Sequence, residues 1–98
     1  MNQISARDLA SQLQENKVVN IIDVREPAEV AGGKIPGAVN IPLGLLEYRM
    51  NELDKSKEYT IVCLSGGRSS QATRFLEYQG FNVTNMMGGM MSWGGEIE

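Results

Sequence analysis

The sequence contains no histidine, and this absence excludes several kinds of chemistry. Without an imidazole there is no Ser-His or Cys-His pair, no histidine general base and no ordinary zinc site. We therefore expect no bound metal and no cofactor. Any nucleophile in this chain has to be activated by backbone N–H groups and by the dipole of a helix.

Cysteine is almost absent as well, since Cys63 is the only one. One cysteine cannot form an internal disulfide. Residues 1–8 are polar and do not resemble a signal peptide. No apolar run approaches the roughly twenty residues that a membrane-spanning helix needs. We therefore expect a protein of the reducing cytoplasm without a membrane partner.

Positive charge is scarce: 9 Lys and Arg stand against 12 Asp and Glu, for a net charge of −3. Binding to nucleic acid relies on clustered cations, so we expect no nucleic-acid partner. The chain has 98 residues, of which 42% are hydrophobic. This length suits one domain, residues 1–98, with one modest core.

Short β-branched runs alternate with amphipathic segments along the chain. Strands are predicted at residues 18–24, 39–41, 59–64 and 81–85, and helices at 6–15, 27–32, 43–50 and 69–79, with a last short helix within 86–95. This alternation predicts an α/β fold, with a mostly parallel sheet covered on both faces. Ligands of such sheets bind at the carboxyl ends of the strands, where Asp23 and Cys63 fall.

Cys63 ends an apolar run and is followed by a glycine-rich turn and a helix. This order directs backbone N–H groups and a helix N-terminus at the sulfur, which favours the thiolate. A free cysteine often only fills space in a core, but a packing cysteine does not need such a loop. The candidate site is therefore Cys63 with the residues that follow it: Leu64, Ser65, Gly66, Gly67, Arg68 and Ser69.

Arg68 is the only cation of this loop, and two roles remain open for it. Its guanidinium can hold an oxyanion of the substrate, or it can pair with a carboxylate such as Asp23 and brace the loop. For Asp23 we favour a structural role, because a carboxylate beside the nucleophile would repel an anionic substrate. Arg25 and Glu29 are four residues apart and are predicted to form an ion pair.

The serines of the loop have more ordinary interpretations. Ser65 can supply a hydroxyl donor inside the loop, although a loop-forming role is favoured. Ser69 and Ser70 are typical of the start of a helix.

Methionine is concentrated near the end of the chain, at Met86, Met87, Met90 and Met91. Thioethers bind copper(I), but packing beside Trp93 is the favoured interpretation, since methionine fills irregular gaps. Exposed methionines beside Trp93 also suit a surface that docks a partner protein.

Several motifs occur together in one order: residues 22–26, Glu29, 33–42, 62–69, 80–81, 88–89 and Trp93. This set resembles the single-domain rhodaneses and covers nearly the whole chain. The resemblance implies a five-stranded parallel sheet flanked by helices on both faces. It also implies a sulfurtransferase in which Cys63 carries a persulfide and backbone N–H groups of the loop surround the sulfur.

The same resemblance implies small sulfur-containing anions as donors, namely thiosulfate or low-molecular-weight persulfides. The acceptors would be thiols, and a sulfur-relay protein is a further possible partner. Two departures from the family pattern are visible. Lys34 stands where histidine is often found, and Leu64 follows the cysteine where a polar, basic or aromatic residue is frequent. The second departure bears on substrate preference.

Two alternatives belong to other classes. A cysteine phosphatase or arsenate reductase also has a Cys…Arg loop, but with a longer spacing than the four residues between Cys63 and Arg68. A binding or regulatory module of the same fold would have lost catalysis, and such modules usually lack the cysteine or the loop. Cys63, Gly66 and Arg68 all remain here, which favours sulfur transfer.

Overall fold

The computed structural model describes all residues 1–98 and is built on one five-stranded sheet in which every neighbouring pair of strands is parallel. The strands are β1 (Asn2–Ser5), β2 (Asn20–Asp23), β3 (Val39–Asn40), β4 (Glu58–Val62) and β5 (Asn82–Met87), in the spatial order β1-β5-β4-β2-β3. The α/β class and the parallel sheet agree with the prediction.

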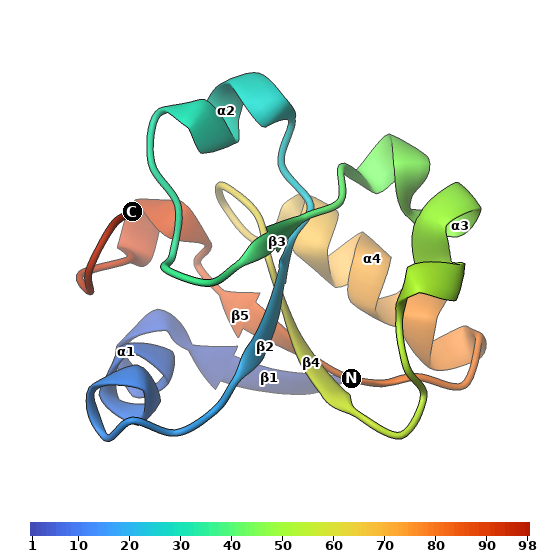
Figure 1. The fold of residues 1–98 in the computed structure, drawn as a ribbon, viewed down its shortest axis with the longest axis horizontal. Coiled ribbons are helices and arrows are strands. Elements are labelled where there is room, and N and C mark those ends of the chain that lie inside the picture. Colours follow the sequence, from blue (N-terminus) through green and yellow to red (C-terminus); the bar gives the residue numbers. More distant parts are fainter.

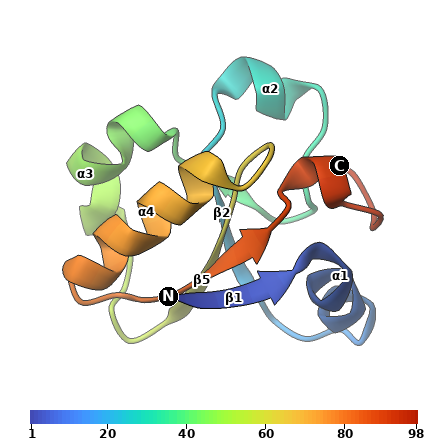
Figure 2. The ribbon, with the colours of Figure 1, turned by 180° about the vertical axis from the view of Figure 1, so that it is seen from behind.

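Helices cover both faces of the sheet, as Figures 1 and 2 show from opposite sides. They are α1 (Ala6–Gln14), α2 (Pro27–Ala31), α3 (Leu46–Arg49) and α4 (Gly67–Tyr78), with 3-10 turns η1 (Leu43–Leu45), η2 (Met50–Glu52) and η3 (Met90–Ser92). One face is covered by α1, and the other by α3 and α4. No helix combines the length and the apolar character that crossing a membrane requires.

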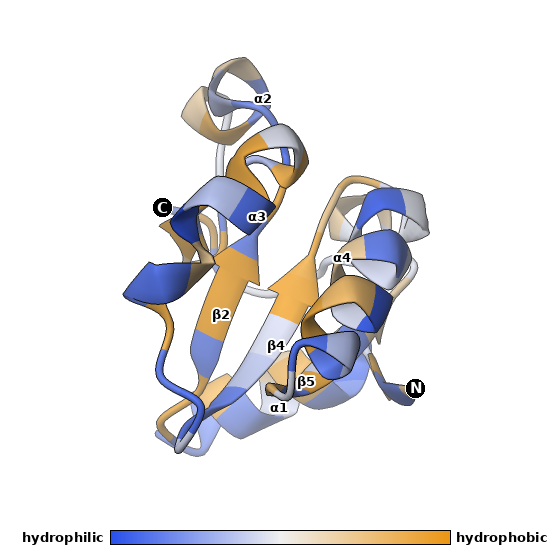
Figure 3. Ribbon diagram, turned by 90° about the vertical axis from the view of Figure 1, so that its right-hand side faces the viewer, coloured by the Kyte–Doolittle hydropathy of each residue, from blue (hydrophilic) through white to orange (hydrophobic).

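The two faces of the sheet pack into two hydrophobic clusters. Ile22 and Ile61 belong to the cluster under α3 and α4, whereas their neighbours Ile21 and Val62 belong to the cluster under α1. Because successive strand residues point to opposite faces, burial on both sides makes β2 and β4 apolar without alternation. Figure 3 shows this hydrophobic character in the carboxyl halves of both strands.

Local signals set several helix starts where the sequence predicted them. The Ser5 hydroxyl accepts a hydrogen bond of 3.0 Å from the N–H of Asp8 at the start of α1. At α2, Pro27 occupies the first turn and Glu29 accepts the N–H of Glu26, which completes a capping box.

Three segments differ from the prediction. β1 was not predicted, because it is short and polar and is held mainly by backbone pairing with β5, from Asn2 opposite Thr84 to Ser5 opposite Met87. The helix predicted over residues 43–50 is shorter: α3 covers only Leu46–Arg49 and lies between the 3-10 turns η1 and η2, since Gly44 lies in its first part and glycine disfavours a helix. β5 continues through Met87, and Met86 is fully buried.

Candidate active site

The candidate site lies at the carboxyl edge of the sheet, where β4 ends at Val62 and Cys63 follows. Asp23 is the last residue of β2 and stands opposite Val62 in the register. The segment between β4 and α4 lies beneath α2 (Figure 1). The structure thus brings Asp23 and Cys63 to the same edge, as the sequence predicted.

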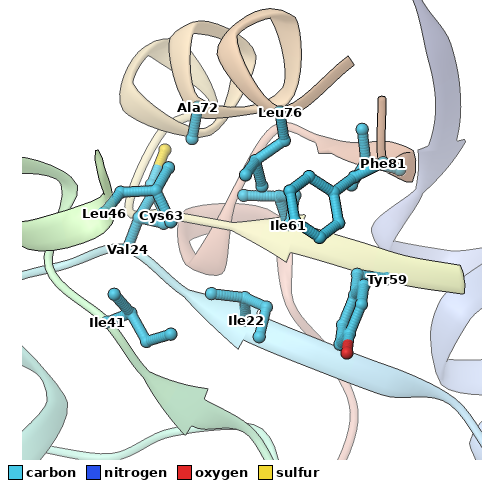
Figure 4. Close-up of a cluster of buried hydrophobic side chains, with 11 residues drawn as sticks. Ile22, Val24, Ile41, Leu46, Tyr59, Ile61, Cys63, Ala72, Leu76 and Phe81 are labelled. Atoms are coloured by element: carbon cyan, nitrogen blue, oxygen red, sulfur yellow. The ribbon is translucent and has the colours of Figure 1, made fainter. Parts of the chain in front are cut away.

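The side chain of Cys63 is fully buried, with 0% of its surface exposed. It packs with Val24, Leu46 and Ala72, and its sulfur is directed to the side of α4 (Figure 4). The cysteine therefore belongs to the hydrophobic core and to the loop at once.

Two groups of the loop form hydrogen bonds with the sulfur. The N–H of Gly66 donates to Sγ at 3.0 Å, and the thiol donates to Oγ of Ser69 at 3.3 Å. Burial alone would raise the pKa of the Cys63 thiol. Hydrogen bonding from the Ser69 hydroxyl and from backbone N–H groups of the loop outweighs burial, so that the pKa is lowered. A lowered pKa increases the fraction of thiolate, the nucleophilic form.

Ser69 has a larger part in the site than its helix-start interpretation suggested. The residue is fully buried, and its hydroxyl also donates to the carbonyl oxygen of Gly66 at 3.2 Å. When Cys63 is a thiol, Ser69 is the acceptor of the S–H. When Cys63 ionises, rotation of the hydroxyl brings its hydrogen to the sulfur. Ser69 can therefore form a hydrogen bond with Cys63 both as a thiol and as a thiolate.

The backbone of the loop needs glycine at one position in particular. Gly66 is the N-cap of α4 and has φ of +108°, a conformation that other residues adopt only with strain. This turn aims the Gly66 N–H at the sulfur and lets α4 begin at Gly67. The N-terminus of a 12-residue helix thus lies close to Cys63.

Arg68 pairs with Glu29, which corrects two expectations. Its two terminal nitrogens donate to the two carboxylate oxygens of Glu29 at 2.7 and 2.8 Å, so that the pair is bidentate. Arg68 does not pair with Asp23, and the Glu29 carboxylate does not pair with Arg25. The Arg68 hydrogen bond, followed by the N–H of Glu26, lowers the pKa of Glu29 to about 2. The pair ties the cysteine loop to α2.

Asp23 and Arg25 form their own buried ion pair. Nη2 of Arg25 lies 2.8 Å from Oδ2 of Asp23, and the side chains are 6% and 0% exposed. Arg25 also donates to the carbonyl oxygens of Gly33 and Glu29. These contacts hold α2 at Glu29, and the chain just beyond its C-terminus at Gly33, against β2. Asp23 thus pairs with Arg25 and not with Arg68, and its structural role stays a prediction.

Backbone N–H groups of η3 also hold the cysteine loop in place. The N–H of Met90 donates to the carbonyl oxygen of Cys63 at 2.8 Å, and that of Met91 donates to Leu64 at 2.9 Å. A side chain on Gly89 would overlap the backbone of Leu64. The sequence marked residues 88–89 as a motif without assigning this contact.

The model of the rhodanese-like domain matches residues 5–96 of the chain. The protein belongs to this family. It is 44% identical over 98 residues to the putative sulfurtransferase YtwF of Bacillus subtilis, covering 100% of this chain and 95% of that protein. It is 39% identical to a sulfurtransferase of Allochromatium vinosum, covering 95% of this chain and 88% of that protein.

More distant relatives and solved structures agree with this assignment. The thiosulfate sulfurtransferase GlpE of Shewanella oneidensis is 32% identical, with 84% of this chain and 82% of that protein covered. The crystal structure of a rhodanese-like domain protein from Staphylococcus aureus superimposes with a TM-score of 0.94 at 39% identity, covering 100% of this chain and 97% of that one.

The two departures from the rhodanese pattern have clear places in the structure. Nζ of Lys34 donates to the carbonyl oxygen of Ala38 at 2.9 Å and pairs with Glu98, so lysine supplies a hydrogen bond across the turn where histidine is often found. Leu64 is 41% exposed at the rim of the loop.

The four methionines at residues 86–91 of this rhodanese-like chain divide into two pairs. Met86 is buried and Met90 packs against the same cluster as Trp93, as the packing interpretation predicted. Met87 and Met91 are exposed.

Proposed function

We propose that this rhodanese-like protein is a sulfurtransferase in which Cys63 accepts a sulfane sulfur and passes it to a thiol. The hydrogen-bonded, buried Cys63 with its lowered pKa is the observation that carries this proposal. Relatives named sulfurtransferase support it. A lone reactive thiol stays reduced in the cytoplasm, where we place this single domain of residues 1–98.

The first half-reaction loads the enzyme. The Cys63 thiolate attacks the outer sulfur of a donor such as thiosulfate, a new S–S bond forms, and the old S–S bond breaks. Its electron pair leaves with sulfite, and the persulfide anion Cys63–S–S⁻ remains. In the second half-reaction an acceptor thiolate attacks the outer sulfur, takes it as a new persulfide and restores the Cys63 thiolate. This is covalent catalysis in two steps.

The loop stabilises charge in both half-reactions. The donors that hold the thiolate are the Gly66 N–H and the Ser69 hydroxyl, and further N–H groups of the loop are close by. After loading, the negative charge moves one atom outward. Fixed dipoles aimed at a site of developing charge need no reorganisation during the reaction.

Access to the sulfur requires movement, because Cys63 is fully covered. Leu64, Ser65 and Gly67 are exposed, and two consecutive glycines make the backbone of this segment adaptable. We place the opening in residues 64–67, which are held on one side by η3 and on the other by the pair of Arg68 with Glu29.

The spacing and the ion pair both disfavour a phosphatase. Only four residues separate Cys63 from Arg68. Both terminal nitrogens of the Arg68 guanidinium already donate to the Glu29 carboxylate. Phosphoryl transfer needs that cation on the phosphate. Hydrolysis of an aryl phosphate at a rate comparable to sulfur transfer would favour the phosphatase over our proposal.

The activity is tested by following thiocyanate formation from thiosulfate and cyanide. We expect turnover by the wild type and none by Cys63→Ser, with thermal unfolding showing that the variant is folded. Turnover that persists in the variant would contradict a role for Cys63. A wild type inactive with thiosulfate and with small persulfides would favour the binding module.

A further inference from the structure

The only cation of the cysteine loop is neutralised by a carboxylate that the fold holds in place. Glu29 engages both terminal nitrogens of Arg68, and its Oε1 also accepts the N–H of Glu26 at 2.9 Å. Arg68 and Glu29 are 35% and 30% exposed, so a small anion can approach them. An oxyanion that bound Arg68 would have to displace a carboxylate that is already oriented.

The charges around the sulfur add a second obstacle to anions. Hydrogen bonding with Glu29 raises the pKa of Arg68 most, and attraction to Cys63 and Glu26 raises it further. The thiolate and the carboxylates of Glu29 and Glu26 thus all attract this one guanidinium, which only Glu29 contacts. The nearby Asp23–Arg25 pair is neutral and contributes no free cation. Among these groups negative charge exceeds positive charge, which disfavours a doubly charged donor.

We propose that Glu29 is a specificity-determining residue, which keeps Arg68 from binding the sulfonate of thiosulfate and so favours sulfur donors of lower charge. This inference rests on the proposed Cys63 persulfide. Glu29 touches neither the sulfur nor the reacting bond, and it acts through Arg68. The preferred donor is a singly charged or neutral sulfane-sulfur compound, such as a thiosulfonate or a small persulfide.

Two donors of the same reactivity type provide the test. Thiosulfate carries two charges and releases sulfite, whereas methanethiosulfonate carries one and releases methanesulfinate. In both reactions the Cys63 thiolate takes the outer sulfur, and the electron pair of the broken S–S bond leaves with the second product. The value of kcat/KM is measured for each donor with cyanide as the common acceptor.

We expect Glu29→Gln to raise the ratio of kcat/KM for thiosulfate over methanethiosulfonate about tenfold, the scale of one charge-assisted hydrogen bond. Glutamine keeps an oxygen that accepts the Glu26 N–H, so the cap of α2 is preserved. The gain should disappear in Glu29→Gln/Arg68→Gln. The matched control is Glu52→Gln, which removes a bidentate pair with Arg49 outside the loop and should leave the ratio unchanged.

An unchanged ratio in Glu29→Gln, an equal change for both donors, or a gain that survives the loss of Arg68 would overturn the inference while the persulfide mechanism stood. A wild type that transfers sulfur from neither donor would overturn both. If Glu29→Gln failed to fold, the salt dependence of the wild-type rate with each donor would test the inference instead. Screening should then accelerate the reaction with thiosulfate more than that with methanethiosulfonate, and equal responses would contradict the inference.

Discussion

The Cys63 sulfur depends on partners that lie within six positions of it along the chain. Gly66 supplies a backbone N–H and Ser69 supplies a hydroxyl, each at hydrogen-bond distance from the sulfur. Because these partners are local, the order of residues around the glycines was enough to predict a stabilised thiolate. The hydroxyl of Ser69 was harder to assign, since serine is also common at the start of any helix.

Ser69→Ala should raise the apparent pKa of the Cys63 thiol, because the variant loses a hydrogen bond to the thiolate. The rate of sulfur transfer at neutral pH should fall roughly tenfold, the effect of one hydrogen bond to a charged group. The pKa is measured from the pH dependence of thiol alkylation in denaturant-free buffer. Ser70→Ala removes a hydroxyl that faces Asn85 and serves as the control. A pKa unchanged in Ser69→Ala would contradict this role.

The partner of Arg68 could not be predicted from the sequence. Its partner Glu29 lies 39 positions away in the chain, and the pairing exists only because the fold places α2 beside the cysteine loop. The i, i+4 spacing of Arg25 and Glu29 predicted a different pair. That prediction was wrong, because Arg25 turns toward the buried carboxylate of Asp23 instead.

At the scale of elements, the cysteine loop is held between α2 and the turn from β5 to η3. The strands that frame it, β2 and β4, were predictable because residues buried on both faces form apolar β-branched runs. β1 was not predictable in the same way. Its residues are polar, and what orders them is the row of backbone groups at the edge of β5.

Gly89→Ala should destabilise the protein by about 2–4 kcal/mol, since backbone strain and overpacking both contribute. Gly89 has φ of +62° and ψ of −164°, and a Cβ there would meet the backbone of Leu64. The free energy of unfolding is measured by urea denaturation. Gly44→Ala is the control, because a Cβ at Gly44 meets nothing within 4 Å. Equal stabilities of the two variants would contradict a close contact between Gly89 and the backbone of Leu64.

At the scale of the whole molecule, buried charge near the site is paired inside the fold. Asp23→Asn should cost about 3–5 kcal/mol of unfolding free energy, because it leaves Arg25 buried without a counterion. Sulfur transfer per folded molecule should change little. Glu52→Gln breaks an exposed pair and should leave the unfolding free energy nearly unchanged. A variant Asp23→Asn that kept its stability but lost sulfur transfer would assign Asp23 a chemical role.

The brace between Arg68 and Glu29 should also shape the acid stability of the molecule. The pKa of Glu29 is lowered from 4.5 to about 2 in the folded protein, so the ionised carboxylate stabilises the fold above pH 4.5. This contribution is lost as the pH falls toward 2. Denaturation at a series of pH values should therefore show that the free energy of unfolding falls less steeply with decreasing pH in Glu29→Gln than in the wild type.

Glu77→Gln, which changes an exposed carboxylate on α4, should keep the acid profile of the wild type. Identical profiles for Glu29→Gln and the wild type would show that the Arg68 pair does not stabilise the fold.

Cys63 should carry a sulfur atom during turnover, and intact-mass spectrometry detects that atom on the protein itself. The wild type and Cys63→Ala are each incubated with thiosulfate or with a small persulfide and desalted without reductant. Their intact masses are then measured. The wild type should gain one sulfur atom and lose it again to a thiol acceptor, and Cys63→Ala should gain none. A wild type that gains no sulfur from either donor, or a variant that gains as much, would contradict this prediction.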